Sequence, residues 1–299
     1  MTTANDPFYE AITPIRDVVQ ALIDLLDPEP APLPHIDSPA MRELALERDF
    51  DGAWGNEAVH HAHVIGSWKR LLAVDCAKAM IRDLYEDPPP VFAHKVLSRA
   101  VIENAAAAAW ILEPAISIRQ RIGRGRNERI FSAKEVLRLP DLPEAQRIRS
   151  NTIIETIRQT ARELGFSVTA NGWIEEDRPR FTRLLRWLLT NDLGGMIANY
   201  YSAVAHGTQY GLASAVLSAE PPTAFGERRV TIGTFPHDVR FALSASGLAL
   251  IKGVSYEIEL FGRDIPEWEQ ACTTVLNVVE EAMRQSKDEL TGILNRDLS

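Results

Sequence analysis

Apolar residues recur at every third or fourth position in most parts of this chain, which is the spacing that gives an α-helix one apolar face. Near the N-terminus, Ile15, Val18, Leu22 and Leu25 form such a stripe. Prolines separate the periodic segments, because a proline ring cannot continue a helix. A chain of 299 residues is long enough to bury most of its apolar surface within one fold. The sequence therefore predicts an all-α fold, a multi-helix bundle.

The periodic segments predict about eight or nine helices in a single domain that covers residues 1–299. An N-terminal helix within 1–27 leads into the Pro-rich loop 28–40, and the segment 91–217 forms the helical core. The expected helices cover residues 8–26, 56–85, 91–112, 116–139, 143–164, 179–190, 192–216, 236–261 and 266–285.

The helical pattern is weaker in two places. Gly123 and Gly125 predict a weak point in the helix that contains them, because glycine has a low helix propensity. Near residues 226–235, Val230 and Ile232 alternate with polar neighbours. That alternation favours a short β-hairpin or a covering loop over another helix.

Composition narrows the class of protein. The chain is 45% hydrophobic and 24% charged, as globular proteins are. Its apolar runs are shorter than the roughly 20 residues that span a bilayer, and its first residues do not resemble a secretory signal. Cys76 and Cys272 lie far apart in the sequence and not in a metal-ligand spacing, so we expect them to be reduced thiols, as is usual in the cytoplasm. We therefore expect a cytoplasmic protein without a membrane partner or a cofactor. The net charge of −9 argues against nucleic-acid binding over the whole surface.

The segment NYYSAVAHGTQYGLASAV places a histidine in an otherwise small-residue pattern. Residues four apart share a row on a helix. One row would be small throughout, and the next would be polar: Ala203, Gly207, Gly211 and Ala215, then Ser202, His206, Tyr210 and Ser214. Two aligned glycines favour close packing of another helix. The alanines 105–109 are the expected partner.

A polar cluster is predicted beside that crossing. Arg99 and Glu103 are four residues apart in the order that opposes the helix dipole, so we expect their partners on another helix. His206 and Ser202 fit as those partners, with Tyr210 on the same row. Three interpretations stay open: a buried structural network, a ligand site, or nuclease-like catalysis. We favour a sealed network.

The segments SRAVIENAAAAAWIL and YYSAVAHGTQYG resemble an uncharacterised bacterial helical-bundle group with an R-x-x-x-E helix and a later S-x-x-x-H helix. That group is similar to HEPN domains. The resemblance implies a helical bundle, a dimer, and Arg99, Glu103, Ser202 and His206 as the matching polar positions. HEPN ribonucleases place an arginine five residues before the histidine, and Tyr201 stands there in this chain. Arg99 would have to supply the missing charge.

The segment SIRQRIGRGRNERIF is strongly basic in an acidic protein. Guanidinium groups bind phosphate oxygens in pairs, so this patch is a candidate site for RNA or a phosphate-bearing ligand. The alternative is a solvated face that pairs with acidic segments such as IEED. The patch contains Arg119, Arg121, Arg124, Arg126 and Arg129, with Arg138, Arg147 and Arg149 following.

Glu57, His60 and His61 form a third candidate cluster. Glu57 and His60 have the E-x-x-H spacing of di-iron bundles. Such a site needs a second E-x-x-H, and the chain has none. A polar helix face is therefore favoured over a metal site.

The first functional hypothesis is a helical-bundle protein that works by binding or self-association. A metal-independent ribonuclease or defence effector that uses His206 with Arg99 is the second. A metal-dependent oxidase around Glu57 and His60 is the third.

Overall fold

The computed structural model describes residues 6–26, 34–49, 57–189, 191–208, 212, 216–219 and 230–297. Within these ranges the chain forms ten helices and one antiparallel pair of short strands, so the all-α prediction is confirmed. The helices are α1 (Pro7–Leu25), α2 (Pro39–Asp49), α3 (Ala58–Asp83), α4 (Ala93–Leu112), α5 (Ile118–Leu137), α6 (Glu144–Glu163), α7 (Phe181–Leu188), α8 (Asn191–Ala205), α10 (Pro236–Phe261) and α11 (Trp268–Asp297), and the strands are β1 (Val216–Ala219) and β2 (Val230–Ile232).

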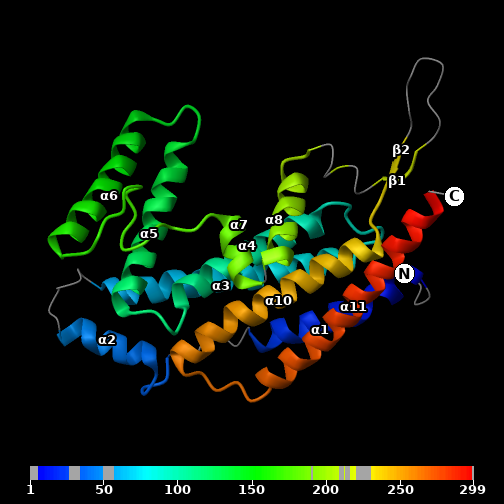
Figure 1. Cartoon of the computed structure of the whole chain (residues 1–299), viewed down its shortest axis with the longest axis horizontal. Helices are drawn as coiled ribbons and strands as arrows, with labels where there is room; N and C mark the ends of the chain where they lie inside the picture. Colours follow the sequence, from blue (N-terminus) through cyan, green and yellow to red (C-terminus); the bar gives the residue numbers. More distant parts are fainter. Residues whose placement is uncertain are drawn as a thin grey trace.

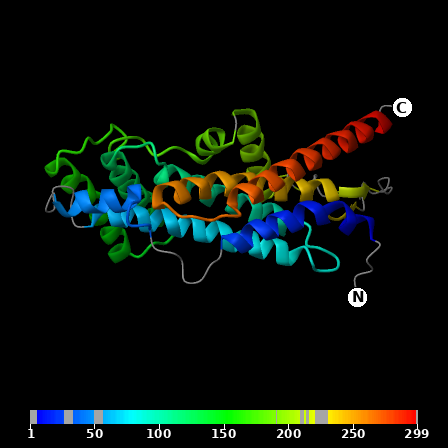
Figure 2. The same cartoon turned by 90° about the horizontal axis from the view of Figure 1, so that it is seen from below.

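Three long helices form the body of the molecule. Helix α4 packs against α3 and against α10, while α1 and α11 cover the side of α10 that faces away from α5 and α6 (Figures 1 and 2). The alanines of α4 make the close packing possible, since a Cβ added to Gly253 of α10 would lie only 2.8 Å from the carbonyl oxygen of Ala105. The partner of the alanine stretch is therefore α10, and the expected pairing with the histidine segment is wrong.

A second, smaller core lies under α5 and α6, which project from the long helices as a pair (Figure 1). Gly125 lies where α5 crosses α3, and a Cβ there would be 2.8 Å from the Cβ of Ala62. Helix α5 runs without interruption through both of its glycines, so the predicted weak point is wrong. The glycine is explained by the close approach of two helices. This core consists of Ala58, Val59, Ile122, Ile130, Ala133, Ile154, Ile157, Ala161, Phe166 and Ile174.

Helix α8 ends at Ala205, eleven residues before its expected end near residue 216. Gly207 adopts φ 58°, the amide of Thr208 donates to the carbonyl of Ala203 at 3.0 Å, and the amide of Gly207 donates to Val204 at 2.9 Å. This is a Schellman C-cap, which glycine favours because it has no Cβ. Nothing lies within 4 Å of a Cβ built on Gly207, so the predicted small-residue ridge is wrong. The remaining members of the two rows, Tyr210, Gly211, Ser214 and Ala215, fall outside the described residues.

Two further helices differ from the sequence expectations. Helix α2 is not among the expected helices, and α11 extends to Asp297, whereas its periodicity predicts an end near residue 285. Strand β2 lies in the region 226–235, where a short hairpin or a covering loop is expected, but its partner β1 lies outside that region and begins at Val216, the last residue of the segment that is expected to be helical. None of the described helices combines the length and the apolar character needed to cross a membrane.

Candidate binding groove

The polar cluster predicted around His206 is not assembled in the described part of the chain. His206 is exposed at the end of α8, and its side chain forms no hydrogen bond or ion pair with a described residue. Arg99 pairs with Glu103 on its own helix, with 3.8 Å between Nε and Oε2, and lies over the ring of Phe181 at 5.3 Å. The expectation that His206 and Ser202 are the partners is wrong, although Arg99 does contact another helix, α7, through Phe181. The expectation that His206 lies in a sealed core is also wrong.

A buried polar network does exist nearby, but with other members. The Ser98 hydroxyl donates to the Ala242 carbonyl at 3.0 Å and lies 3.1 Å from the Tyr201 hydroxyl, and Ser246 donates to Ser98 at 2.9 Å. Burial raises the pKa of Tyr201, so its phenol stays protonated. Tyr201, which occupies the position of the HEPN arginine five residues before His206, is therefore buried in the core, while His206 is exposed. No local pattern joins residues 98 and 246, which are 148 positions apart.

Two of the predicted patch arginines are sealed inside the molecule. Arg121 is fully buried, and its guanidinium donates to both carboxylate oxygens of Glu43 at 2.8 and 3.0 Å and to the carbonyls of Ile111 and Glu113. His63 lies on the same carboxylate, with Nε2 2.8 Å from Glu43 Oε2. Burial lowers the pKa of His63 despite this contact, so its imidazole is neutral at pH 7 and donates to Glu43.

Arg124 is buried beside them. Its Nη1 donates to Glu113 at 2.7 Å and to the Trp110 carbonyl, and its Nε donates to Glu176 at 2.5 Å. Arg119 pairs with Glu175 at 3.0 Å on the half-exposed side of the helix. Pairing with the IEED segment, 174–177, is thus confirmed for two arginines. The expectation of a solvated face is wrong for Arg121 and Arg124, because helix phase turns them toward the core.

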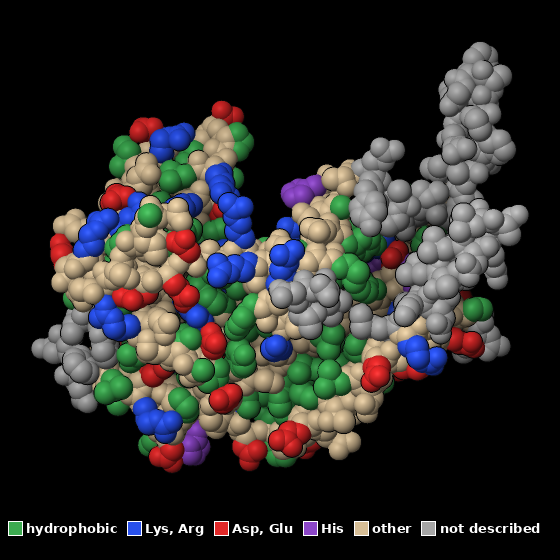
Figure 3. All heavy atoms as spheres, viewed as in Figure 1, with side chains coloured by type: hydrophobic (Ala, Val, Ile, Leu, Met, Phe, Trp, Pro, Cys, Tyr) green, Lys and Arg blue, Asp and Glu red, His purple; other side chains and the backbone are tan. Residues whose placement is uncertain are grey.

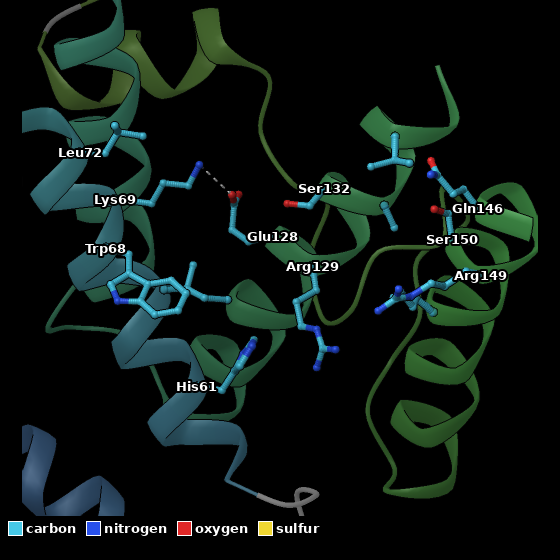
Figure 4. A pocket seen from close by; sticks show the side chains of 14 residues that line it. His61, Trp68, Lys69, Leu72, Glu128, Arg129, Ser132, Gln146, Arg149 and Ser150 are labelled. Carbon is cyan, nitrogen blue, oxygen red and sulfur yellow. Dashed lines mark ion pairs between the residues drawn. The ribbon is translucent and has the colours of Figure 1, made fainter. Parts of the chain in front are cut away.

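A groove lies between α3 and α6, with α5 as its floor. Both outer helices pack on α5, and the groove between them has a cavity volume of about 660 Å³. Figure 4 shows Trp68 on α3, Arg129 on α5 and Arg149 on α6 directed into this space. The Trp68 ring is 67% exposed although its helix is part of the body. The other apolar lining residues are Ile65, Leu72, Ala133, Val136 and Ile153.

The charged groups of the groove are unevenly paired. Glu128 is buried and is shared by Arg178, at 2.5 Å, and Lys69, at 3.5 Å. Arg129 and Arg149 are exposed and form no ion pair with any residue that the structure describes. A net positive charge therefore faces the groove in a protein whose total charge is −9.

A second cavity of about 400 Å³ continues the groove toward the start of α3. It shares His61, Arg129 and Ile153 with the first cavity. The additional lining residues are Glu57, Ala58, Arg126, Thr152, Thr156, Ile157 and Thr160. Burial and the charges of Arg129 and Arg126 lower the pKa of His61. The groove thus brings together residues from two predicted clusters, the arginine patch and the metal candidates.

The metal alternative finds no ligand set here. Glu57 precedes α3 in a left-handed conformation, with φ 49°, and Glu47 caps the helix by accepting from the amide of Val59 at 2.7 Å. Among the residues that the structure describes, no three His, Cys, Asp or Glu side chains are placed to hold a metal ion. The E-x-x-H spacing of Glu57 and His60 therefore has no facing partner in those ranges.

Another basic surface lies at α7, where Arg183, Arg186 and the N-cap residue Arg180 are all exposed. In Figure 3, Lys and Arg side chains lie in a hollow of the surface between the α5–α6 pair and α8. The cavity beside Arg183 measures about 160 Å³ and is also lined by three carboxylates, Glu113, Glu176 and Asp177. The groove over α5 is larger and its positive charge is less compensated, so it is the stronger candidate site.

Searches for a matching family model, a similar curated protein and a similar solved structure find no match.

Proposed function

We propose that this protein binds a ligand that has both an apolar and an anionic part, and that it does so in the groove between α3 and α6. The observation that carries the proposal is the position of exposed Trp68 opposite Arg129 and Arg149, which lack acidic partners among the described residues. An aromatic ring exposed in a concave site beside guanidinium groups is typical of ligand pockets.

The energetics favour an occupant of mixed character. Covering a large apolar side chain stabilises a complex by about 1.5–3 kcal/mol, and Leu72 adjoins Trp68 with 48% of its surface exposed. The exposed arginines would remain uncompensated beneath a purely apolar ligand. An anionic group on the ligand supplies acceptors for them.

Fluorescence titration with anilinonaphthalene sulfonate tests this proposal, since the probe joins an apolar ring system to an anion. We expect Trp68→Ala to weaken binding about tenfold, which corresponds to the loss of roughly 1.4 kcal/mol of contact. Trp187→Ala is the matched comparison, because Trp187 is also part-exposed, at 38%, but lines the weaker candidate cavity beside Arg183 instead of the groove. Equal loss in both variants, or no binding by the wild type, would contradict the proposal.

Self-association is a second candidate, because the same face of α3 exposes Trp68, Leu71 and Leu72. A second copy that covers this face would bury them. Light scattering after size-exclusion chromatography measures the mass of the wild type and of Trp68→Ala. A dimer that dissociates in the variant favours self-association through α3. A monomeric wild type rules this candidate out.

The HEPN-like ribonuclease remains an alternative proposal, supported by the exposure of His206. Cleavage of an unstructured RNA by wild type, His206→Ala and His60→Ala tests it, with His60 as an exposed control. Loss of cleavage in His206→Ala alone is the expected result. RNA left intact by the wild type excludes this activity.

A further inference from the structure

The groove has two chemically different ends. The larger cavity contains the exposed Trp68 with Leu72 and Val136, beside polar and charged side chains that include Lys69 and Arg149. In the smaller cavity arginine, histidine and threonine side chains lie beside Glu57, Ala58 and two isoleucines, and the two cavities meet at His61, Arg129 and Ile153. A molecule that lies along the groove would therefore contact apolar groups at one end and hydrogen-bond donors at the other.

Three threonines form one wall of the polar end. Thr152, Thr156 and Thr160 stand four residues apart on α6, so their hydroxyls form a row along one face of the helix. Hydroxyl groups can donate to an anion without adding charge. The row thus offers repeated donors along the cavity.

The opposite walls provide positive charge. Arg126 and Arg129 are three residues apart on α5 and face the same cavity. Arg126 is partly buried, and burial together with the charge of Arg129 lowers its pKa. His61 of α3, neutral at pH 7, adds a ring N–H. Among the described residues that line this cavity, Glu57 is the one acid, and it is exposed to solvent, which screens its charge.

We infer that the polar end holds a phosphate monoester group, while the organic part of the same ligand lies against Trp68. Guanidinium groups and hydroxyls together match three terminal oxygens and up to two negative charges, which is more than a carboxylate presents. This inference rests on the proposed function and names the class of its ligand. The ligand is a small alkyl or aryl phosphate monoester.

Calorimetric titration with octyl phosphate and octyl glucoside, each below its critical micelle concentration, tests the inference. The two probes share a tail and differ in head group. We expect octyl phosphate to bind about tenfold more tightly or better, as a charge-assisted contact predicts. Inorganic phosphate alone should bind more weakly than octyl phosphate, because it lacks the apolar part.

Variants assign the head group to its site. Arg129→Gln should weaken octyl phosphate about tenfold and leave octyl glucoside unchanged. Thr156→Val keeps the shape of the side chain, removes one hydroxyl and should weaken octyl phosphate by about threefold to tenfold. Arg138→Gln and Thr274→Val are matched controls, since Arg138 is the C-cap of α5, outside the cavity, and Thr274 is exposed on α11. Both should bind octyl phosphate as the wild type does.

The outcomes separate the two claims. If both octyl probes bind equally and Trp68→Ala weakens both, the phosphate inference is overturned and the proposed groove function stands. If neither probe binds, both claims fail. If octyl phosphate binds more tightly but Arg129→Gln and Arg138→Gln weaken it alike, the phosphate group is not held in this cavity and the inference is overturned.

Discussion

Helix α5 carries arginines in two opposite environments, although Arg124 and Arg129 are only five residues apart. Arg124, with Arg121, lies in a sealed network whose acceptors are carboxylates and backbone carbonyls. Arg129, with Arg126, lines an open groove. Five residues rotate a helix by about 140°, which is enough to turn one pair toward α4 and the other toward α6. The same residue type in the same helix thus has a structural role on one face and a candidate binding role on the other.

The comparison shows that charge density in a sequence does not locate a binding surface. A buried guanidinium needs every donor satisfied, and the chain provides Glu43, Glu113 and Glu176 for that purpose. Arg129, which has no carboxylate partner among the described residues, is the arginine of α5 that can bind an external anion. The buried and the groove-lining arginines differ in whether folding places a carboxylate side chain from another segment beside them.

The largest effect is expected from breaking the sealed network. Glu43→Ala leaves the fully buried Arg121 without its counter-ion, and this should lower the free energy of unfolding by about 3–5 kcal/mol. Urea unfolding followed by circular dichroism measures the change. A loss smaller than about 1 kcal/mol would place this pair among weak surface ion pairs and remove the contrast between the two faces.

The second largest effect on stability is expected from acid, which protonates the buried His94. Burial lowers the pKa of His94 to about 4, against about 6.5 in an unfolded chain. The unfolded state therefore binds the proton more readily, so stability is full above pH 6.5 and falls as the pH drops toward 4. This site should contribute roughly 3 kcal/mol of that loss. Unfolding titrations at several pH values in wild type and His94→Gln measure it.

His61→Gln sharpens the acid prediction, because His61 lies in the open groove and is only half-buried. Its pKa is also lowered, but it should remove less of the acid dependence than His94→Gln does. An equal effect in the two variants would show that the groove is as desolvated as the core.

Gly125→Ala should have an intermediate effect. The added methyl would lie 2.8 Å from the Cβ of Ala62 and would force α5 away from α3, at a cost of about 1–3 kcal/mol. Gly165→Ala is a control for glycine chemistry away from close packing, because nothing lies within 4 Å of its Cβ position, although its positive φ adds a local cost. If the two variants lose equal stability by thermal unfolding, the close crossing is not the reason for Gly125.

The smallest effect on stability is expected on the open face. Arg129→Gln removes no ion pair with a described residue, so the free energy of unfolding should change by less than about 0.5 kcal/mol. Urea unfolding of this variant beside Glu43→Ala makes the comparison direct. A loss above about 2 kcal/mol would show that Arg129 belongs to the structural network.

The sequence predicted most helices within a few residues because their boundaries depend on local chemistry. Helix α10 begins at Pro236 and ends before Gly262, as its pattern indicates, since proline suits the first turn and glycine the position after the last. Glycine chemistry also explains Gly207, which ends α8, although the sequence pattern favours close helix packing at that residue. Local sequence therefore contained that answer as well.

The candidate groove was predicted only in fragments. Arg126, Arg129 and His61 were each named, but in separate clusters with separate roles. Trp68 and the threonines of α6 have no local signal that separates them from other helix residues. They meet because α3 and α6 both pack on α5, and no spacing along one helix reveals that contact.

By itself the sequence determined that this chain is helical and where most of its helices begin and end, because periodicity, prolines and glycines act over a few residues. Tertiary structure alone decided which arginines are sealed and which face a groove. That choice depends on helix phase and on carboxylates brought in from α2, from the end of α4 and from the loop before α7, each far from α5 in the sequence or fixed only by packing.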